Sequence, residues 1–266
     1  MSVYPSVSED REEDAMGDLH LTPRLAGLLV EAATTAPSFR NSQPWCFQMR
    51  PGDSVIELYA EPARVPPRTD PDGRAAHISC GAALFNLRLA VTCAGAEPVT
   101  RLLPDPAEPR LLATVRLAGP HRPRARELDL CAALWRRHSG QVPRTGPPLR
   151  PSLLAALAEA AALEGTALFP CGEEAVLTTA AAGRADWLRA GQALERLLLL
   201  ATQHGVVAGP LHEALDIRTR PAGQGPGPGG QHPQLTLRMG YGRAGPATPR
   251  RPVSEVLRIA APALAR

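Results

Sequence analysis

The sequence predicts an α+β fold built from two tandem copies of one helix-and-strand unit, which together form a pseudo-dimer. Helical periods of apolar residues alternate along the chain with short runs of strand-forming residues. Residues 81–95 and 191–205 also align without a gap, and the strands predicted after them match as Val115-Arg116-Leu117 and Leu237-Arg238-Met239. The identical pairs in this alignment are Gly81/Gly191, Ala83/Ala193, Leu84/Leu194, Leu87/Leu197, Leu89/Leu199, Thr92/Thr202 and Gly95/Gly205. The abundance of Ala and Leu explains some matches, but not the shared Gly and Thr.

The first half of the chain begins with a predicted helix from Thr22 to Thr35. Thr22 suits the N-cap and Pro23 the first helical position, and the apolar residues that follow at helical spacing are Leu25, Leu28, Leu29 and Ala32. A polar turn then leads into a short strand before the Pro51-Gly52-Asp53 turn. The remaining predicted elements of this half are a strand at 55–60, a helix at 81–94 that ends at Gly95, and a strand at 112–117.

The second half repeats this order of elements. Helices are predicted at 128–135, 151–164 and 187–204, and strands at 166–169, 175–179 and 234–240. The Gly- and Pro-rich residues 219–233 are predicted to form a flexible loop. The chain thus divides into a disordered leader (1–20), a first half (21–120) and a second half (121–266).

Composition excludes several classes of protein. The 266 residues are 44% hydrophobic and 21% charged, which is ordinary for a globular protein, and the net charge of +3 is too small to indicate a nucleic-acid partner. The acidic run from Ser8 to Asp14 cannot be the core of a signal peptide, and the apolar stretches are too short for a membrane span. No metal-binding motif is present. These features predict a soluble, cytoplasmic protein with no membrane or nucleic-acid partner.

The cysteines predict no disulfide framework. Their number is odd and no two are spaced as CxxC; the five are Cys46, Cys80, Cys93, Cys131 and Cys171. Buried or half-buried thiols in a reducing cytoplasm are the expectation.

Two motifs resemble those of FMN-dependent nitroreductases. The segment Ala36-Pro37-Ser38-Phe39-Arg40-Asn41-Ser42-Gln43-Pro44-Trp45-Cys46-Phe47 is similar to the P-S-x-x-N-x-Q-P-W-x-F motif of that family, and Arg137-His138-Ser139 to its R-x-S motif. The stretches 70–74 and 77–88 resemble the Acg-like branch, whose members are actinobacterial single chains made of two nitroreductase-like halves. Thr248-Pro249-Arg250-Arg251-Pro252-Val253 resembles the basic C-terminal segment of the family.

The resemblance implies one FMN site composed from both halves. Cations and donors for the flavin phosphate would be Arg137, Ser139, Arg250 and Arg251, and partners for the ribityl chain and the ring edge would be Ser38, Asn41 and Gln43. His138 is included in the site, although it could only shape the turn. Pro210 and Glu213 correspond to the turn whose backbone lies near flavin N5 in relatives. Trp45 could be a core anchor or a flavin contact, and Arg250-Arg251 an ordinary solvated tail.

The resemblance implies an oxidoreductase that passes electrons from NADH or NADPH through FMN to a small-molecule acceptor such as a nitroarene or quinone. No side chain is required as a nucleophile or general base. The alternatives are a flavin-binding or flavin-sequestering protein with little turnover, and a scaffold without a cofactor. Gln141 replaces a common basic residue of the family, and Cys171-Gly172-Glu173-Glu174 replaces the long helical lid of Acg-like chains. A monomeric pseudo-dimer and a homodimer are both compatible with this reading.

Overall fold

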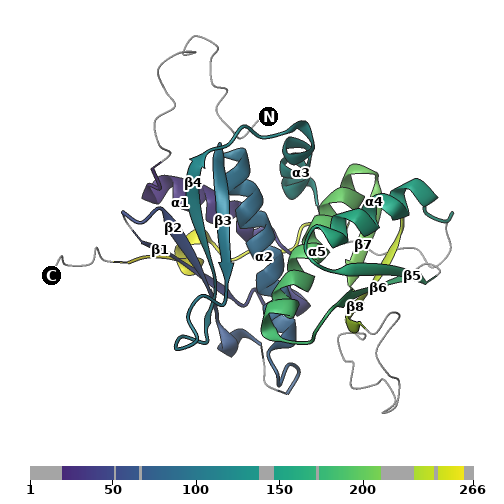
Figure 1. Ribbon diagram of the computed structural model, residues 1–266, viewed down its shortest axis with the longest axis horizontal. Coiled ribbons are helices and arrows are strands. Elements are labelled where there is room, and N and C mark those ends of the chain that lie inside the picture. Colours follow the sequence, from purple (N-terminus) through teal and green to yellow (C-terminus); the bar gives the residue numbers. More distant parts are fainter. Residues whose placement is uncertain are drawn as a thin grey trace, which may run out of the picture.

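The computed structural model describes residues 20–50, 52–65, 68–137, 147–171, 174–210, 231–242 and 245–260. Two β-sheets lie on either side of a central pair of long helices, α2 (Arg74–Cys93) and α5 (Arg184–Gln203) (Figure 1). The predicted α+β class is confirmed. Residues 1–19 of the predicted leader, residues 219–230 of the predicted loop, and His138, Ser139, Gln141, His212 and Glu213 lie outside the described residues. The last two residues of the predicted loop belong to strand β8 (His232–Tyr241).

The first unit contains α1 (Pro23–Thr34), β1 (Trp45–Arg50), β2 (Val55–Ala60), α2, β3 (Ala96–Leu102) and β4 (Leu111–Pro120). The Thr22 hydroxyl accepts a hydrogen bond from Leu25 N–H at 3.2 Å, which confirms the predicted N-cap. The helix predicted from residue 81 begins earlier, because the Asp70 carboxylate accepts the free N–H groups of Ala75 and Ala76 at 3.0 and 2.8 Å. Sequence reasoning missed β3, which contains Pro98 and lies at a sheet edge, where proline is tolerated.

The second unit follows the same plan after α3 (Ala125–Arg136). Its elements are α4 (Pro151–Ala162), β5 (Ala167–Cys171), β6 (Glu174–Thr179), α5, β7 (Val206–Pro210) and β8 (His232–Tyr241). The strand order β5-β6-β8-β7 corresponds position by position to β1-β2-β4-β3 of the first sheet. The C-terminal α7 (Val253–Val256) and β9 (Leu257–Ile259) return to the first unit, where β9 pairs with β1 in parallel. Sequence reasoning missed both β7 and β9.

The two central helices cross at the aligned glycines. A Cβ at Gly81 would collide with the Leu188 carbonyl oxygen and lie 3.0 Å from the Gly191 Cα. A Cβ at Gly191 would collide with the Ile78 carbonyl oxygen and lie 2.8 Å from the Gly81 Cα. Because Ile78 and Leu188 are equivalent in the aligned repeat, each contact has an equivalent contact on the other helix. This reciprocity is what a two-fold axis between two copies produces.

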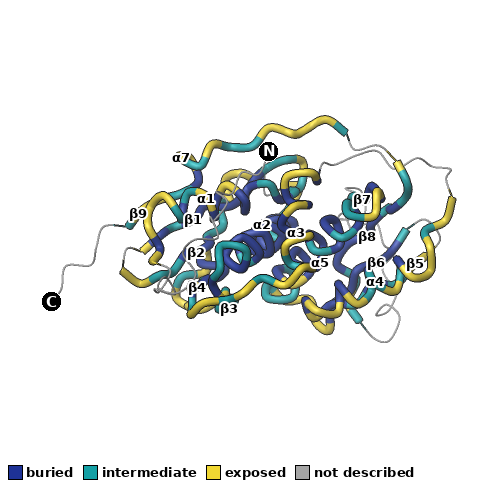
Figure 2. The backbone as a smooth tube through the Cα atoms, turned by 90° about the horizontal axis from the view of Figure 1, so that it is seen from above, coloured by how far each residue is buried: buried dark blue, intermediate teal, exposed yellow. Residues whose placement is uncertain are grey.

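Each unit has its own apolar core. The first core lies among α1, α2, α3 and the first sheet, and the second among α4, α5 and the second sheet. Trp45 is 0% exposed within the first core, which makes it a core anchor. Helix α2 is long and apolar enough to cross a membrane by composition, but 89% of its most apolar stretch is buried inside the protein. Figure 2 shows it as the buried centre of the molecule.

The expectation of five free thiols is wrong for two of them. Cys93 and Cys131 form a disulfide that joins α2 to α3. They are 38 residues apart, so only the packing of α3 against α2 brings them together. Cys46 and Cys80 are buried free thiols, as expected, whereas Cys171 is exposed.

Candidate functional site

In the turn between α1 and β1, the predicted site residues Asn41 and Gln43, together with Arg40, have an unusual backbone conformation. Arg40, Asn41 and Gln43 have φ values of +49°, +56° and +48°. Left-handed residues other than glycine are uncommon, and they concentrate at functional sites. The Ser38 hydroxyl accepts a hydrogen bond from Gln43 N–H at 3.0 Å and thereby stabilises the turn. A second anchor comes from α2, where the Ser79 hydroxyl accepts from Phe39 N–H at 3.1 Å.

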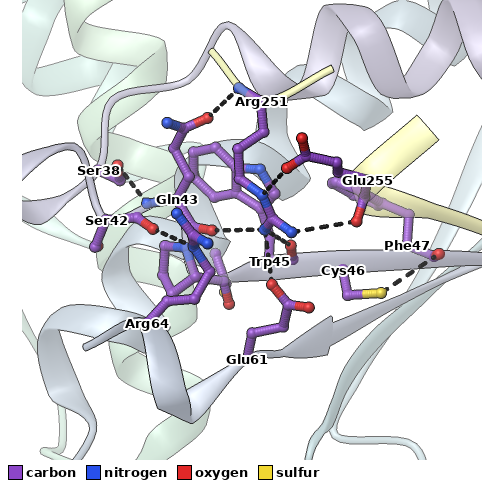
Figure 3. A network of polar contacts seen from close by, with 12 residues as sticks. Ser38, Ser42, Gln43, Trp45, Cys46, Phe47, Glu61, Arg64, Arg251 and Glu255 are labelled. Atoms are coloured by element: carbon purple, nitrogen blue, oxygen red, sulfur yellow. Dashed lines mark hydrogen bonds and ion pairs between the residues drawn. The ribbon is translucent and has the colours of Figure 1, made fainter. Parts of the chain in front are cut away.

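The C-terminal segment lies against this turn, as the resemblance implied. The Asn41 side-chain amide donates to the Pro249 carbonyl at 3.1 Å, and Arg250 Nη1 donates to Asn41 Oδ1 at 3.2 Å. The Arg251 backbone N–H donates to Gln43 Oε1 at 2.8 Å, a contact visible in Figure 3. Residues more than 200 positions apart in the sequence therefore share one site.

Arg137 and Arg250 converge at the C-terminal end of α1. Arg137 Nη2 and Arg250 Nη2 donate to the same acceptor, the Thr35 carbonyl oxygen, at 2.7 and 3.0 Å. Arg250 Nε also donates to the Thr34 carbonyl at 2.9 Å. The last carbonyls of a helix lack helical partners and carry its negative dipole end, so they attract cations. The backbone of α1 thus holds two guanidinium groups side by side.

A buried carboxylate lies beneath these cations. Glu195 is 0% exposed, and its Oε1 lies 3.4 Å from Arg137 Nε and accepts a hydrogen bond from the Asn86 amide at 3.0 Å. The same amide donates to the Thr35 hydroxyl at 3.0 Å. Burial raises the pKa of Glu195 to about 7, although Arg137, the Asn86 hydrogen bond and Arg250 oppose this shift. Burial and the charge of Arg137 lower the pKa of Arg250, while Glu195 raises it.

The raised pKa of Glu195 predicts a pH-dependent stability. Its ordinary value is 4.5, so between about pH 4.5 and 7 the folded protein retains a proton that the unfolded chain releases. Stability therefore falls as the pH rises through this window, by up to about 3 kcal/mol. Glu195→Gln removes this titration. Urea unfolding at about pH 5, 6, 7 and 8 should show a steeper loss of stability in the wild type than in the variant. Both proteins contain His77, so its contribution to the pH dependence cancels in the comparison. Parallel plots of stability against pH for the two proteins would contradict a raised pKa of Glu195.

The resemblance grouped Arg251 with the phosphate ligands, but the structure separates it from them. Its guanidinium forms an ion pair with Glu61 at 2.7 Å and donates to the Glu255 carbonyl at 3.2 Å and the Trp45 carbonyl at 3.4 Å (Figure 3). Among the described residues, it shares no partner with Arg137 or Arg250. The neighbouring arginines therefore have different partners, and Arg250 is the one placed beside Arg137.

Of the remaining predicted site residues, the structure describes the backbone of Pro210 but not His138, Ser139 or Glu213. Pro210 ends β7, an edge strand, opposite Leu237. Because proline has no N–H, a backbone donor to flavin N5 would have to come from a neighbouring residue.

His77 is a buried residue of the first turn of α2: its Nδ1 donates to the Gly73 carbonyl at 2.6 Å and its Nε2 accepts from Arg184 at 3.0 Å. Its burial lowers its pKa. In the described part of the chain, no group of three or more His, Cys, Asp or Glu could hold a metal.

The structure supports the sequence reading that a lid segment is missing between β5 and β6. These strands pair as a hairpin up to Cys171 opposite Glu174, so only two residues connect them. The Acg-like lid expected from the resemblance therefore has no room at this position.

Sequence reasoning missed the carboxylates that pair with Arg137 and Arg251, and the amide of Asn86 that donates to Glu195. Asn86 and Glu195 lie on helix faces that otherwise pack against apolar residues, and Glu61 precedes a short 3₁₀ turn. A charged residue inside the apolar period of residues 187–204 was the one available signal, because a buried carboxylate requires a partner.

Comparisons with known proteins agree with the resemblance. No family model matches the chain. It is 35% identical over 120 residues to an uncharacterized protein of Mycobacterium tuberculosis, covering 44% of this chain and 35% of that protein. It is 32% identical over 139 residues to an M. tuberculosis protein that carries the provisional name NAD(P)H nitroreductase acg, covering 50% of this chain and 40% of the relative. The matched segments thus span less than half the length of these relatives.

The fold also has a counterpart among solved structures. The crystal structure of a provisionally named nitroreductase from Anabaena variabilis superposes with a TM-score of 0.60. The superposition covers 83% of this chain and 88% of that one, at 13% sequence identity. At this identity the superposition establishes a shared fold.

Proposed function

The chain has the nitroreductase fold and resembles the Acg-like branch of that superfamily, and from this premise we propose that it binds one FMN per molecule. The bound flavin would accept electrons from NADH or NADPH and pass them to a small electron-poor acceptor such as a nitroarene or quinone. The observation that carries this proposal is the convergence of Arg137 and Arg250 on one carbonyl oxygen beside the strained turn.

The charges of this site fit a phosphate group. Two guanidinium groups face a single buried carboxylate, Glu195, so the cluster carries an excess positive charge. Arg137 Nε is buried, and it lies 3.4 Å from Glu195 Oε1 in an ion pair without the geometry of a hydrogen bond. A phosphate would compensate the excess charge through charge-assisted hydrogen bonds, which are stronger than neutral ones.

The other residues of the turn suit the uncharged parts of a flavin. Asn41 and Gln43 provide amide donors and acceptors, and the Ser38 hydroxyl lies within the same turn. FMN, when bound, supplies the hydride chemistry itself, so the protein has to bind and orient it. Ser139, His138 and Glu213 remain proposals of the resemblance, because they lie outside the described residues.

The division of the site between the two units supports one flavin per chain. The strained turn belongs to the first unit, whereas Arg137 follows α3 and Arg250 belongs to the C-terminal segment. In the second unit, the equivalent turn connects α4 to β5 at residues 163–166, and its sequence Leu-Glu-Gly-Thr contains no Ser-x-x-Asn-x-Gln motif. We propose a cytoplasmic protein that functions as a monomeric pseudo-dimer or as a homodimer.

Anaerobic reduction tests the enzymatic part of the proposal. After reconstitution with FMN, NADH or NADPH should bleach the flavin absorption within seconds to minutes, and a nitroarene or quinone should restore it. Retained flavin that neither nicotinamide bleaches would contradict the oxidoreductase and favour a flavin-sequestering protein. The resemblance implies that the lid segment shields the flavin in Acg-like relatives. Because this chain lacks that segment, the flavin-sequestering alternative has to be tested.

A further inference from the structure

A cleft of about 530 Å³ lies on the outer side of the first sheet, apart from the Arg137–Arg250 cluster. Its floor includes Cys46, Gln48 and Tyr59 of β1 and β2, whose neighbours Trp45, Phe47 and Leu58 point into the core. This alternation makes one face of the sheet apolar and the other polar. The volume lies within the roughly 300–1,000 Å³ of small-molecule sites.

The charged residues of the cleft are mostly cationic. Four guanidinium groups and two carboxylates line it: Arg64, Arg110, Arg251, Arg258, Glu61 and Glu108. The two carboxylates are already paired, Glu61 with Arg251 at 2.7 Å and Glu108 with Arg110 at 3.6 Å. The cleft therefore has a formal excess of two positive charges, and Arg64 and Arg258 carry it.

Arg64 and Arg258 are available to a ligand. Arg64 Nε donates to the Ser42 carbonyl at 2.7 Å, which fixes its position and leaves its other N–H groups for a ligand (Figure 3). Arg258 is exposed on β9 opposite Gln48, and it forms no ion pair within the described ranges. Burial raises the pKa of the Cys46 thiol on the floor of the cleft; Arg258 and Arg251 oppose this shift, and Glu61 adds to it.

We propose that this cleft is a second binding site, which takes a small organic anion bearing phosphate or carboxylate groups and holds it between Arg64 and Arg258. Planar guanidinium groups bind both kinds of oxyanion through paired hydrogen bonds. Arg251 connects the cleft with the turn, since its guanidinium pairs with Glu61 in the cleft and its backbone N–H binds Gln43. The site exists independently of the flavin, so failure of the proposed function leaves it standing.

Calorimetric titration tests the site with two probes, inorganic pyrophosphate and citrate, at low salt. The titration is done without flavin and repeated with excess FMN, so that it does not depend on flavin binding. The Arg250→Gln variant is titrated as well, so that anions in the flavin site are recognised. We expect one saturable site per chain with a Kd below about 1 mM. The double variant Arg64→Gln/Arg258→Gln should bind at least about tenfold more weakly. The probe that binds more tightly identifies the preferred oxyanion.

The matched control is Arg116→Gln, which removes an exposed arginine of the same sheet that does not line the cleft. Its affinity for either probe should stay within about twofold of the wild type, since a distant exposed charge is largely screened. Equal binding by the wild type and the double variant, or no saturation, would overturn the proposal. A loss of binding in Arg250→Gln alone would place the anion in the flavin site and overturn it as well.

Discussion

Gly191→Ala should destabilise the protein by about 3 kcal/mol or more, the largest effect expected of a single methyl group in this chain. The added Cβ would collide with the Ile78 carbonyl oxygen and lie 2.8 and 2.9 Å from Gly81 Cα and Ala82 N. All three atoms belong to the backbone of α2, so no side-chain rotation relieves the collision. The helices would have to separate, and both cores pack against them. Urea unfolding at constant pH measures the change.

Gly27→Ala is the matched control, because it makes the same substitution inside another helix. A Cβ at Gly27 of α1 meets no atom within 4 Å. Alanine favours a helix interior over glycine by about 1 kcal/mol, so this variant should be as stable as the wild type or more stable. Equal effects of Gly27→Ala and Gly191→Ala would show that helix propensity, and not the contact between α2 and α5, determines the result.

Arg250→Gln should weaken FMN binding by about 10- to 100-fold, the largest effect expected on the ligand. The variant removes one of the two guanidinium groups at Thr35 and leaves Arg137 with Glu195. Riboflavin, which lacks the phosphate, serves as an internal control. Its affinity should be nearly the same in the wild type and the variant, because Arg250 would contact only the phosphate. Fluorescence quenching titrations give both dissociation constants.

Equal losses for FMN and riboflavin would contradict the phosphate assignment, because they would mean that Arg250 supports the turn as a whole. The structure gives a reason to test for this outcome, because Arg250 Nη1 also donates to Asn41 Oδ1 at 3.2 Å. Arg137 is less suited to the test. Its removal would leave the buried carboxylate of Glu195 without its cation, and an unpaired buried charge typically costs about 3–5 kcal/mol of stability.

Local signals in the sequence were sufficient for most of the fold. The N-cap at Thr22, the glycines after α2 and α5, and the apolar periods of these helices are short-range features, and the elements they predict are present. The missed strands β3, β7 and β9 depend on pairing with distant neighbours. β9 is three residues long and exists because β1 offers a free edge. No window of sequence contains that information.

The candidate site, like the fold, could be predicted from the sequence only in part. The Ser38-x-x-Asn41-x-Gln43 turn is a contiguous motif and could be identified from the sequence. The different partners of Arg250 and Arg251 could not, because they depend on which side chain reaches the end of α1 and which reaches Glu61. The disulfide between Cys93 and Cys131 and the buried pair of Arg137 and Glu195 likewise follow from how α2, α3 and α5 pack.

The stoichiometry of FMN binding tests the central claim most directly. The purified protein is incubated with excess FMN and desalted, and the flavin absorption is compared with the protein concentration. One composite site predicts about one FMN per chain, retained in the wild type and reduced in Arg250→Gln. Two FMN per chain would mean that both sides of the pseudo-dimer bind flavin. Protein that emerges colourless would contradict the flavin site altogether.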